Sequence, residues 1–213
     1  RQALPSCTPW LCYVFLILFL FGYQPLAYST TFTATSQLDS VDTDLGDGVC
    51  KDNSGLCTLR AAIQQINASP SSNDTIELPA GVYTLSLSDS ADTDATNDLD
   101  LEANVIIRST GTLKAINTVV DGGAIARVFH IHPGITATID GITIRNGDVK
   151  PDSGGGIYNQ GILTLTESSL SVNRSILHGA GIFNEGTLAI ARSTINNNVA
   201  TGKGGGIYNA SGS

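Results

Sequence analysis

Gly-Gly-Gly-Ile-Tyr-Asn at residues 154–159 returns as Gly-Ala-Gly-Ile-Phe-Asn at residues 179–184 and as Gly-Gly-Gly-Ile-Tyr-Asn at residues 204–209. Each copy starts 25 residues after the one before it. Between the copies, apolar and small polar residues alternate, as in Leu-Thr-Leu-Thr at residues 163–166, which is typical of short strands. A fixed period of this length indicates a solenoid built from repeated units.

One repeat has the length of one coil of such a solenoid. At about 3.3 Å per extended residue, a repeat traces roughly 80 Å, which is too long for a hairpin and fits three short strands joined by three corners. We therefore predict an all-β fold, a parallel β-helix with about 25 residues per coil. Stacking would align equivalent residues in columns: Ile157 with Ile182 and Ile207, Leu163 with Leu188, Leu165 with Ile190, Leu170 with Ile195, Asn159 with Asn184 and Asn209, and, from a degenerate upstream copy, Ile139 with Leu165 and Ile144 with Leu170.

A further column is aromatic. Tyr158, Phe183 and Tyr208 occupy the same place in the three copies and would point away from the isoleucines. Rings stacked for structural reasons are one interpretation, and a platform on which sugars stack is the other. These three residues are the candidate ligand-binding residues, and no catalytic residue is predicted.

The N-terminal segment is apolar. Residues 10–23 are almost continuously hydrophobic, which is short for a bilayer span of about 20 residues and fits the apolar region of a secretory signal. We predict a signal peptide over residues 1–29, and an uncleaved membrane anchor is the alternative. The chain also stops inside a repeat, which predicts a β-helix over residues 76–213 that is truncated at its C-terminus.

Residues 30–75 are expected to close the N-terminal end of the β-helix. Loss of the signal peptide leaves Cys50 and Cys57, an even pair in an exported protein, which favours a disulfide over a metal site. Residues 58–68 carry one apolar stripe at helical spacing, with Thr58 as the expected N-cap. The open end of a solenoid exposes its core and unpaired strand groups, so this short helix is predicted to act as a cap.

Cys-Thr-Leu-Arg-Ala-Ala at residues 57–62, followed by Thr-Ile-Glu-Leu-Pro-Ala-Gly-Val-Tyr at residues 75–83, resembles the CSLREA domain of exported bacterial proteins. Thr58 and Ala61 depart from the family motif Cys-Ser-Leu-Arg-Glu-Ala, and Arg60 is retained. The Gly-rich copies resemble the right-handed parallel β-helix repeats, of the pectin lyase-like kind, that usually follow this domain, and also those of polymorphic outer-membrane proteins. The resemblance implies a right-handed β-helix and a secreted or cell-surface location, and it implies no particular activity.

The chain is acidic, with a formal net charge of −8, which argues against nucleic acid or an anionic membrane as a partner. Acidic side chains are dense between residues 89 and 102, where Asp92, Asp94 and Asp98 are the candidates for a calcium site. The calcium-loop pattern fails because Asn97 stands where glycine is needed. A solvated acidic loop is the preferred interpretation, and no metal or cofactor is predicted.

Catalytic groups on the predicted coils are few. Asp121 and Asp140 are the candidate carboxylates, and nothing in the sequence brings them together as a glycosidase would require. His130 and His132 share one face of a strand, but no carboxylate is aligned with them in the sequence, which favours a structural role. Arg127 is interpreted as a solvated strand arginine.

The sequence therefore favours an exported, non-enzymatic surface or adhesin-like module that presents a regular face to a polysaccharide or a host surface. The alternative is a carbohydrate-active β-helix enzyme, a polysaccharide lyase or glycoside hydrolase, whose catalytic coils lie outside this fragment. A spacer that holds another domain away from the cell is a third hypothesis. Contact with a membrane is expected only through the signal peptide or a missing C-terminal anchor.

Overall fold

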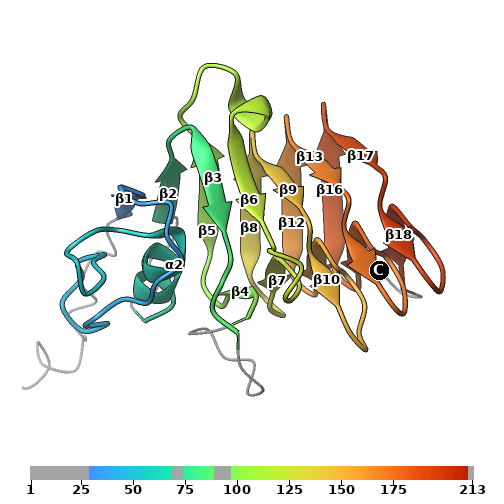
Figure 1. Cartoon of the computed structure of the whole chain (residues 1–213), viewed down its shortest axis with the longest axis horizontal. Helices are drawn as coiled ribbons and strands as arrows, with labels where there is room; N and C mark the ends of the chain where they lie inside the picture. The colour runs from blue at the N-terminus through green and yellow to red at the C-terminus, as the bar shows by residue number, and fades with distance from the viewer. Residues whose placement is uncertain (1–28, 69–73, 89–96, 211–213) are drawn as a thin grey trace, which may run out of the picture.

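The computed structural model describes residues 29–68, 74–88 and 97–210, and this part of the chain is a stack of short parallel strands (Figure 1). The strands form four sheets that run along the axis of a β-helix, and every strand pair in register is parallel. This confirms the predicted all-β fold.

The first sheet contains β1 (Thr31–Thr33), β2 (Asp74–Leu78), β5 (Val105–Ser109), β8 (Thr136–Asp140), β12 (Ile162–Thr166) and β16 (Thr187–Ala191). The second contains β3 (Gly81–Thr84), β6 (Thr118–Asp121), β9 (Thr143–Arg145), β13 (Ser169–Ser171) and β17 (Thr194–Asn196). The third contains β4 (Leu99–Leu101), β7 (Phe129–Ile131), β11 (Ile157–Asn159), β15 (Ile182–Asn184) and β19 (Ile207–Asn209). The fourth contains β10 (Asp148–Val149), β14 (Arg174–Ser175) and β18 (Val199–Ala200), and a 3-10 helix, η1 (Lys114–Ile116), lies between β5 and β6.

The core consists of aliphatic columns, as the repeat predicts. Ile139, Leu165 and Ile190 pair in one column, and Ile144, Leu170 and Ile195 pair in another. Alternation puts these side chains inside and their neighbours outside, because successive residues of a strand face opposite sides. Every predicted column is confirmed in register, including the isoleucine column that starts at Ile157 and the pair of Leu163 and Leu188.

Two columns of asparagine stabilise the corners. The Nδ2 atom of Asn159 donates to Oδ1 of Asn184 at 2.6 Å, and Asn184 donates in turn to Asn209 at 3.2 Å, which confirms the first column. The second column was not among those predicted from the sequence. In it, Asn173 is fully buried and its Nδ2 atom donates to Oδ1 of Asn198 at 3.0 Å. Its own Oδ1 accepts a bond from the backbone of Gly147, so the column satisfies buried corner groups that would otherwise lack partners.

Gly155 is needed where two coils come together. A Cβ atom on this residue would lie 2.1 Å from the carbonyl oxygen of Arg174, which is backbone and has little room to move. We expect Gly155→Ala to lower the free energy of unfolding by about 1–3 kcal/mol, as overpacking does elsewhere. Urea denaturation followed by far-UV circular dichroism measures this.

Gly111→Ala is the matched control for that substitution. A Cβ atom at Gly111 would meet its nearest atoms at 3.5 Å, which is an ordinary contact. Gly111→Ala should leave the midpoint of urea denaturation unchanged or raise it slightly, because alanine restricts the conformations of the unfolded chain. Equal midpoints for the two variants would contradict the close approach at Gly155.

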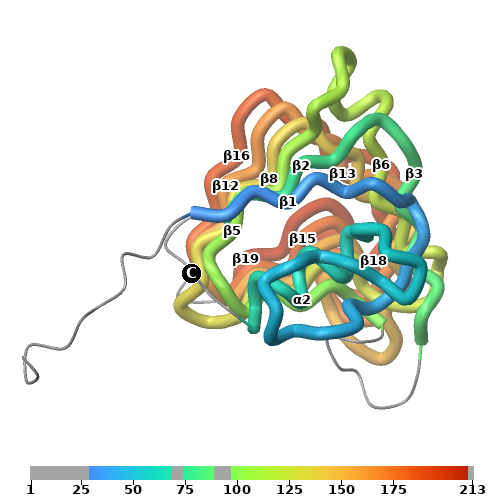
Figure 2. The backbone as a smooth tube through the Cα atoms, turned by 90° about the vertical axis from the view of Figure 1, so that its left-hand side faces the viewer, coloured from blue at the N-terminus to red at the C-terminus, as the bar shows by residue number. Residues whose placement is uncertain are grey.

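The N-terminal end is covered by α2 (Leu59–Ala68), which lies across the opening of the coil (Figure 2). Its buried residues Ile63 and Ile66 belong to the same core cluster as the strands, and the helix contacts β2 and β4. Thr58 caps the helix, with its Oγ1 accepting from the backbone nitrogen of Ala61 at 3.1 Å. The capping helix is thus confirmed.

A buried ion pair joins this cap to the first coil. The Arg60 guanidinium donates to both carboxylate oxygens of Asp39, at 2.6 and 3.3 Å, and the two side chains are 0% and 2% exposed. Arg60 also donates to the backbone carbonyls of Asn97 and Asp98. One side chain therefore ties the loop before α2 to the chain that leads into β4.

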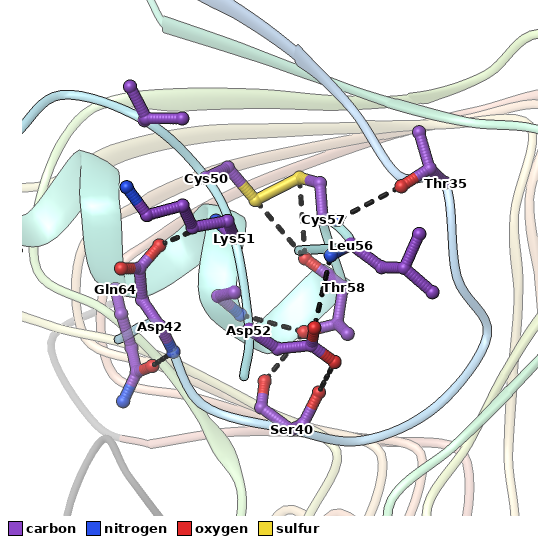
Figure 3. Close-up of a disulfide and its surroundings, with 12 residues drawn as sticks. Thr35, Ser40, Asp42, Cys50, Lys51, Asp52, Leu56, Cys57, Thr58 and Gln64 are labelled. Atoms are coloured by element: carbon purple, nitrogen blue, oxygen red, sulfur yellow. Dashed lines mark hydrogen bonds between the residues drawn. A yellow bond between two sulfur atoms is a disulfide. The ribbon is translucent and has the colours of Figure 1, made fainter. Parts of the chain in front are cut away.

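Cys50 and Cys57 form the predicted disulfide beside the start of α2 (Figure 3). The small loop that the bond closes corresponds to an entropic stabilisation of about 2.5 kcal/mol. Within this loop, Asp52 accepts hydrogen bonds from the backbone nitrogens of Ser54 and Leu56, and from the hydroxyl of Ser40, so the connection is well ordered.

The predicted signal peptide lies almost entirely in residues 1–28, outside the described residues. Among the described helices, none has the length and apolar character that crossing a bilayer requires.

Candidate functional site

The outer face of the third sheet carries a row of polar and aromatic side chains. The central residue of each strand in this sheet faces outward, because the residues on either side of it point into the core. In register these central residues are Asp100, His130, Tyr158, Phe183 and Tyr208. We call the last four the ring column.

The rings of this column pack against one another. His130 and Tyr158 are stacked, with centroids 4.8 Å apart and planes within 2°. Phe183 and Tyr208 are also parallel at 5.6 Å, and His178 stacks on Tyr208 at 4.7 Å. The Tyr158 and Phe183 rings are 5.3 Å apart and tilted by 58°, so the parallel stacking is interrupted there. The three candidate aromatic residues are thus half-buried and adjacent.

Hydrogen-bonding groups lie beside the rings. The Tyr158 hydroxyl donates to Oε2 of Glu185 at 2.7 Å. The amide nitrogen Nε2 of Gln160 donates to the Tyr158 hydroxyl oxygen at 2.8 Å and to the same Glu185 oxygen at 3.0 Å. Burial raises the pKa of the Tyr158 hydroxyl above its ordinary value, and the Glu185 carboxylate raises it further. Tyr158 therefore remains a neutral donor at physiological pH.

Asp100, His130 and His132 form a cluster at the N-terminal end of the ring column. Oδ1 of Asp100 lies 3.2 Å from Nδ1 of His130 and 2.9 Å from Nε2 of His132. Burial alone would raise the pKa of Asp100, but hydrogen bonds from the two histidines outweigh it and hold the pKa below its ordinary value. For His130, burial lowers the pKa, but bonds to Asp100 and Gln160 outweigh burial and raise it above its ordinary value.

This cluster corrects, for residues 99–101, the interpretation of the acidic run between residues 89 and 102 as a solvated loop. Leu99 and Leu101 are buried and Asp100 alternates with them, so this segment is a strand. The carboxylate that the sequence did not align with the two histidines is therefore supplied by the preceding coil. The alternation of Leu99, Asp100 and Leu101 was the signal that could have revealed it.

Arg127 is buried rather than solvated, which corrects a second expectation. Its guanidinium bonds Asp98 at 3.0 Å and Asp152 at 2.7 Å, and it lies 4.9 Å from the centroid of the Tyr158 ring. Arg127, Asp98 and Asp152 line an open cleft of about 340 Å³, together with Lys150. Of the calcium candidates, Asp98 is held in this ion pair, and Asp92 and Asp94 lie outside the described residues.

The carboxylates that were considered for catalysis are held in separate ion pairs. Asp121, at the end of β6 in the second sheet, accepts from Arg145 at 2.7 Å. Asp140, at the end of β8 in the first sheet, lies 3.2 Å from the Lys114 ammonium. The structure does not bring the two together as a pair.

Comparison with known proteins gives a short match. Residues 192–210, which include β17, β18 and β19, match the family model described as the Chlamydia polymorphic membrane protein repeat. No curated protein and no solved structure matches the chain. The C-terminal coil is therefore similar to one repeat of the polymorphic membrane proteins.

Proposed function

We propose that the chain is an exported, non-enzymatic module displayed at the cell surface, and that its third sheet binds an extended neutral polysaccharide. The observation that carries this proposal is the ring column, which continues in register over successive coils. A polymer that lies along the axis would meet a ring at each coil, so that several weak contacts act together.

The chemistry of the face supports a sugar as ligand. The half-buried tyrosine and phenylalanine rings offer apolar surface at successive positions along this face. Gln160 and Glu185 stand beside the rings and can exchange their mutual bonds for bonds to sugar hydroxyls. The net charge of −8 disfavours polyanions, which selects neutral polymers.

The surface location rests on three resemblances. The match at residues 192–210 is to a repeat of membrane proteins, and it supports an outer-membrane or extracellular location. The apolar residues 10–23 support a signal peptide, and we infer a CSLREA-type cap over residues 30–75 from its Cys-Thr-Leu-Arg motif. None of these resemblances supplies a ligand, which comes only from the chemistry of the third sheet.

Affinity electrophoresis of the full chain in gels that contain neutral polysaccharides tests the proposal. We expect one or more of these polymers to retard the protein. Phe183→Ala should weaken the retardation about two- to tenfold, because an aromatic contact is worth about 0.5–1.5 kcal/mol. The control is Ile162→Ala, which truncates an apolar side chain that is 47% exposed on the first sheet and should not change retardation.

Absence of retardation by all polymers, or equal loss in the two variants, would contradict binding at the ring column. Shortening of the polysaccharide during incubation would instead favour the alternative of a carbohydrate-active β-helix enzyme. Chromatography of the incubated polymer by size distinguishes that outcome from simple binding.

A further inference from the structure

We propose that Asp100, His130 and His132 bind a divalent transition-metal ion of the Zn²⁺ class on the outer face of the third sheet. The three residues each offer one ligand atom, and these atoms all lie within 4.8 Å of one another. This proposal does not depend on polysaccharide binding.

The ligand types select the class of metal. Two imidazoles and one carboxylate suit Zn²⁺ and its neighbours in the first transition row, whereas Ca²⁺ and Mg²⁺ prefer sites made wholly of oxygen atoms. Three protein ligands leave one position of a tetrahedral Zn²⁺ ion open, as in sites that also bind water. His132 is 32% exposed, so the cluster can be reached from solvent.

The spacing of the ligand atoms fits a single ion. Bonds of about 2.0–2.1 Å with tetrahedral angles place neighbouring ligand atoms about 3.3 Å apart. The two histidine nitrogens that face Oδ1 of Asp100 lie at 3.2 and 2.9 Å from it. Two of the three separations therefore match those around a single ion, and the third is within 4.8 Å.

The hydrogen bond to Gln160 determines which ring nitrogen of His130 is free to bind a metal ion. The amide nitrogen of Gln160 donates to two acceptors, the Tyr158 hydroxyl and the Glu185 carboxylate, so its oxygen is the atom that faces Nε2 of His130 at 3.0 Å. Nε2 must then carry a hydrogen, so Nδ1 is the nitrogen that faces the Asp100 carboxylate, and it offers a lone pair whenever the ring is neutral. A bound cation would take the place of the proton between these two atoms, and Gln160 is the outer partner that orients the ligand.

The backbone and the surrounding charge also favour a cation. Asp100 is fixed opposite His130 by strand pairing, and its carbonyl accepts a bond from Asn67 of α2 at 2.9 Å. The nearby positive charge of Arg127 is offset by its pairs with Asp98 and Asp152. The Glu185 carboxylate, which accepts a hydrogen bond from Gln160, adds a negative charge on the same face.

Isothermal titration calorimetry of the tag-free full chain tests the site, after chelator treatment and alkylation of the thiols outside the disulfide. We expect Zn²⁺ to bind with one ion per chain, and Ca²⁺ and Mg²⁺ not to compete. Asp100→Asn and His132→Gln should each weaken Zn²⁺ binding at least tenfold, and Gln160→Leu should weaken it about tenfold, as loss of an outer partner does. Co²⁺ should show the visible absorption of a four-coordinate ion in the unmodified chain and lose it in Asp100→Asn.

His178→Gln is the matched control. His178 is another ring on the same face, stacked on Tyr208, and its Nδ1 accepts from the backbone of Lys203. Its removal should leave Zn²⁺ affinity unchanged. Absence of Zn²⁺ binding, unchanged affinity in Asp100→Asn when circular dichroism shows a native fold, or an equal loss in His178→Gln would each overturn the proposal.

Discussion

Arg60→Ala is expected to lower the free energy of unfolding by about 3–5 kcal/mol, the cost of breaking a buried ion pair. The substitution leaves the Asp39 carboxylate, which is 2% exposed, without its counter-charge. It also removes the donor to the carbonyls of Asn97 and Asp98, so that α2 loses a direct link to the first coil. Urea denaturation followed by far-UV circular dichroism measures the effect.

Arg108→Ala is the control for the buried arginine. Arg108 pairs with Glu77 at 2.7 Å on the outside of the first sheet, where the two side chains are 50% and 25% exposed. Water screens such pairs, so its loss should cost at most about 1 kcal/mol. Equal shifts of the urea midpoint in the two variants would contradict a stabilising link through Arg60 between α2 and the first coil.

Leu165→Ala is expected to cost about 2–5 kcal/mol, because it opens a cavity in the centre of a core column. Leu165 is fully buried and pairs with Ile139 on one side and Ile190 on the other. In a solenoid each coil depends on its two neighbours, so the loss should weaken the coils on both sides. The shift of the urea midpoint, with an unchanged native spectrum, measures it.

Ile190→Ala tests whether burial decides the size of this effect. Ile190 belongs to the same column but is 38% exposed, so its truncation removes less buried apolar surface and leaves no closed cavity. It should therefore destabilise the chain less than half as much as Leu165→Ala. An equal effect of the two would show that the column does not form the core.

The parts of the site that could be predicted follow the 25-residue period. Tyr158, Phe183 and Tyr208 fall at equal spacing, and the structure places them in one column as expected. The second asparagine column, Asn173 with Asn198, obeys the same period and could have been found in the same way. Equal spacing is sufficient to predict these columns, because coils of the same length place equivalent residues directly above one another.

The cluster of Asp100, His130 and His132 could not be found by that rule. His130 lies 28 residues before Tyr158, and Asp100 lies 30 residues before His130, so the period fails upstream of the repeats. The many aspartates around Asp100 are typical of a solvated loop. The segment is nevertheless a strand, because Leu99 and Leu101 are buried in the core. The sequence likewise indicates a solvated Arg127, because its partners Asp98 and Asp152 come from other segments.

The sequence by itself determined the β-helix and its core columns through local alternation and a constant repeat, the capping helix through one apolar stripe, and the disulfide through an even pair of cysteines. Tertiary structure alone decided that Arg60 lies buried against Asp39 and that Asp100 faces His130 and His132. The physical reason is that coils of unequal length can stack in several registers. The register is selected by packing among residues far apart in the chain, and local sequence carries no record of that choice.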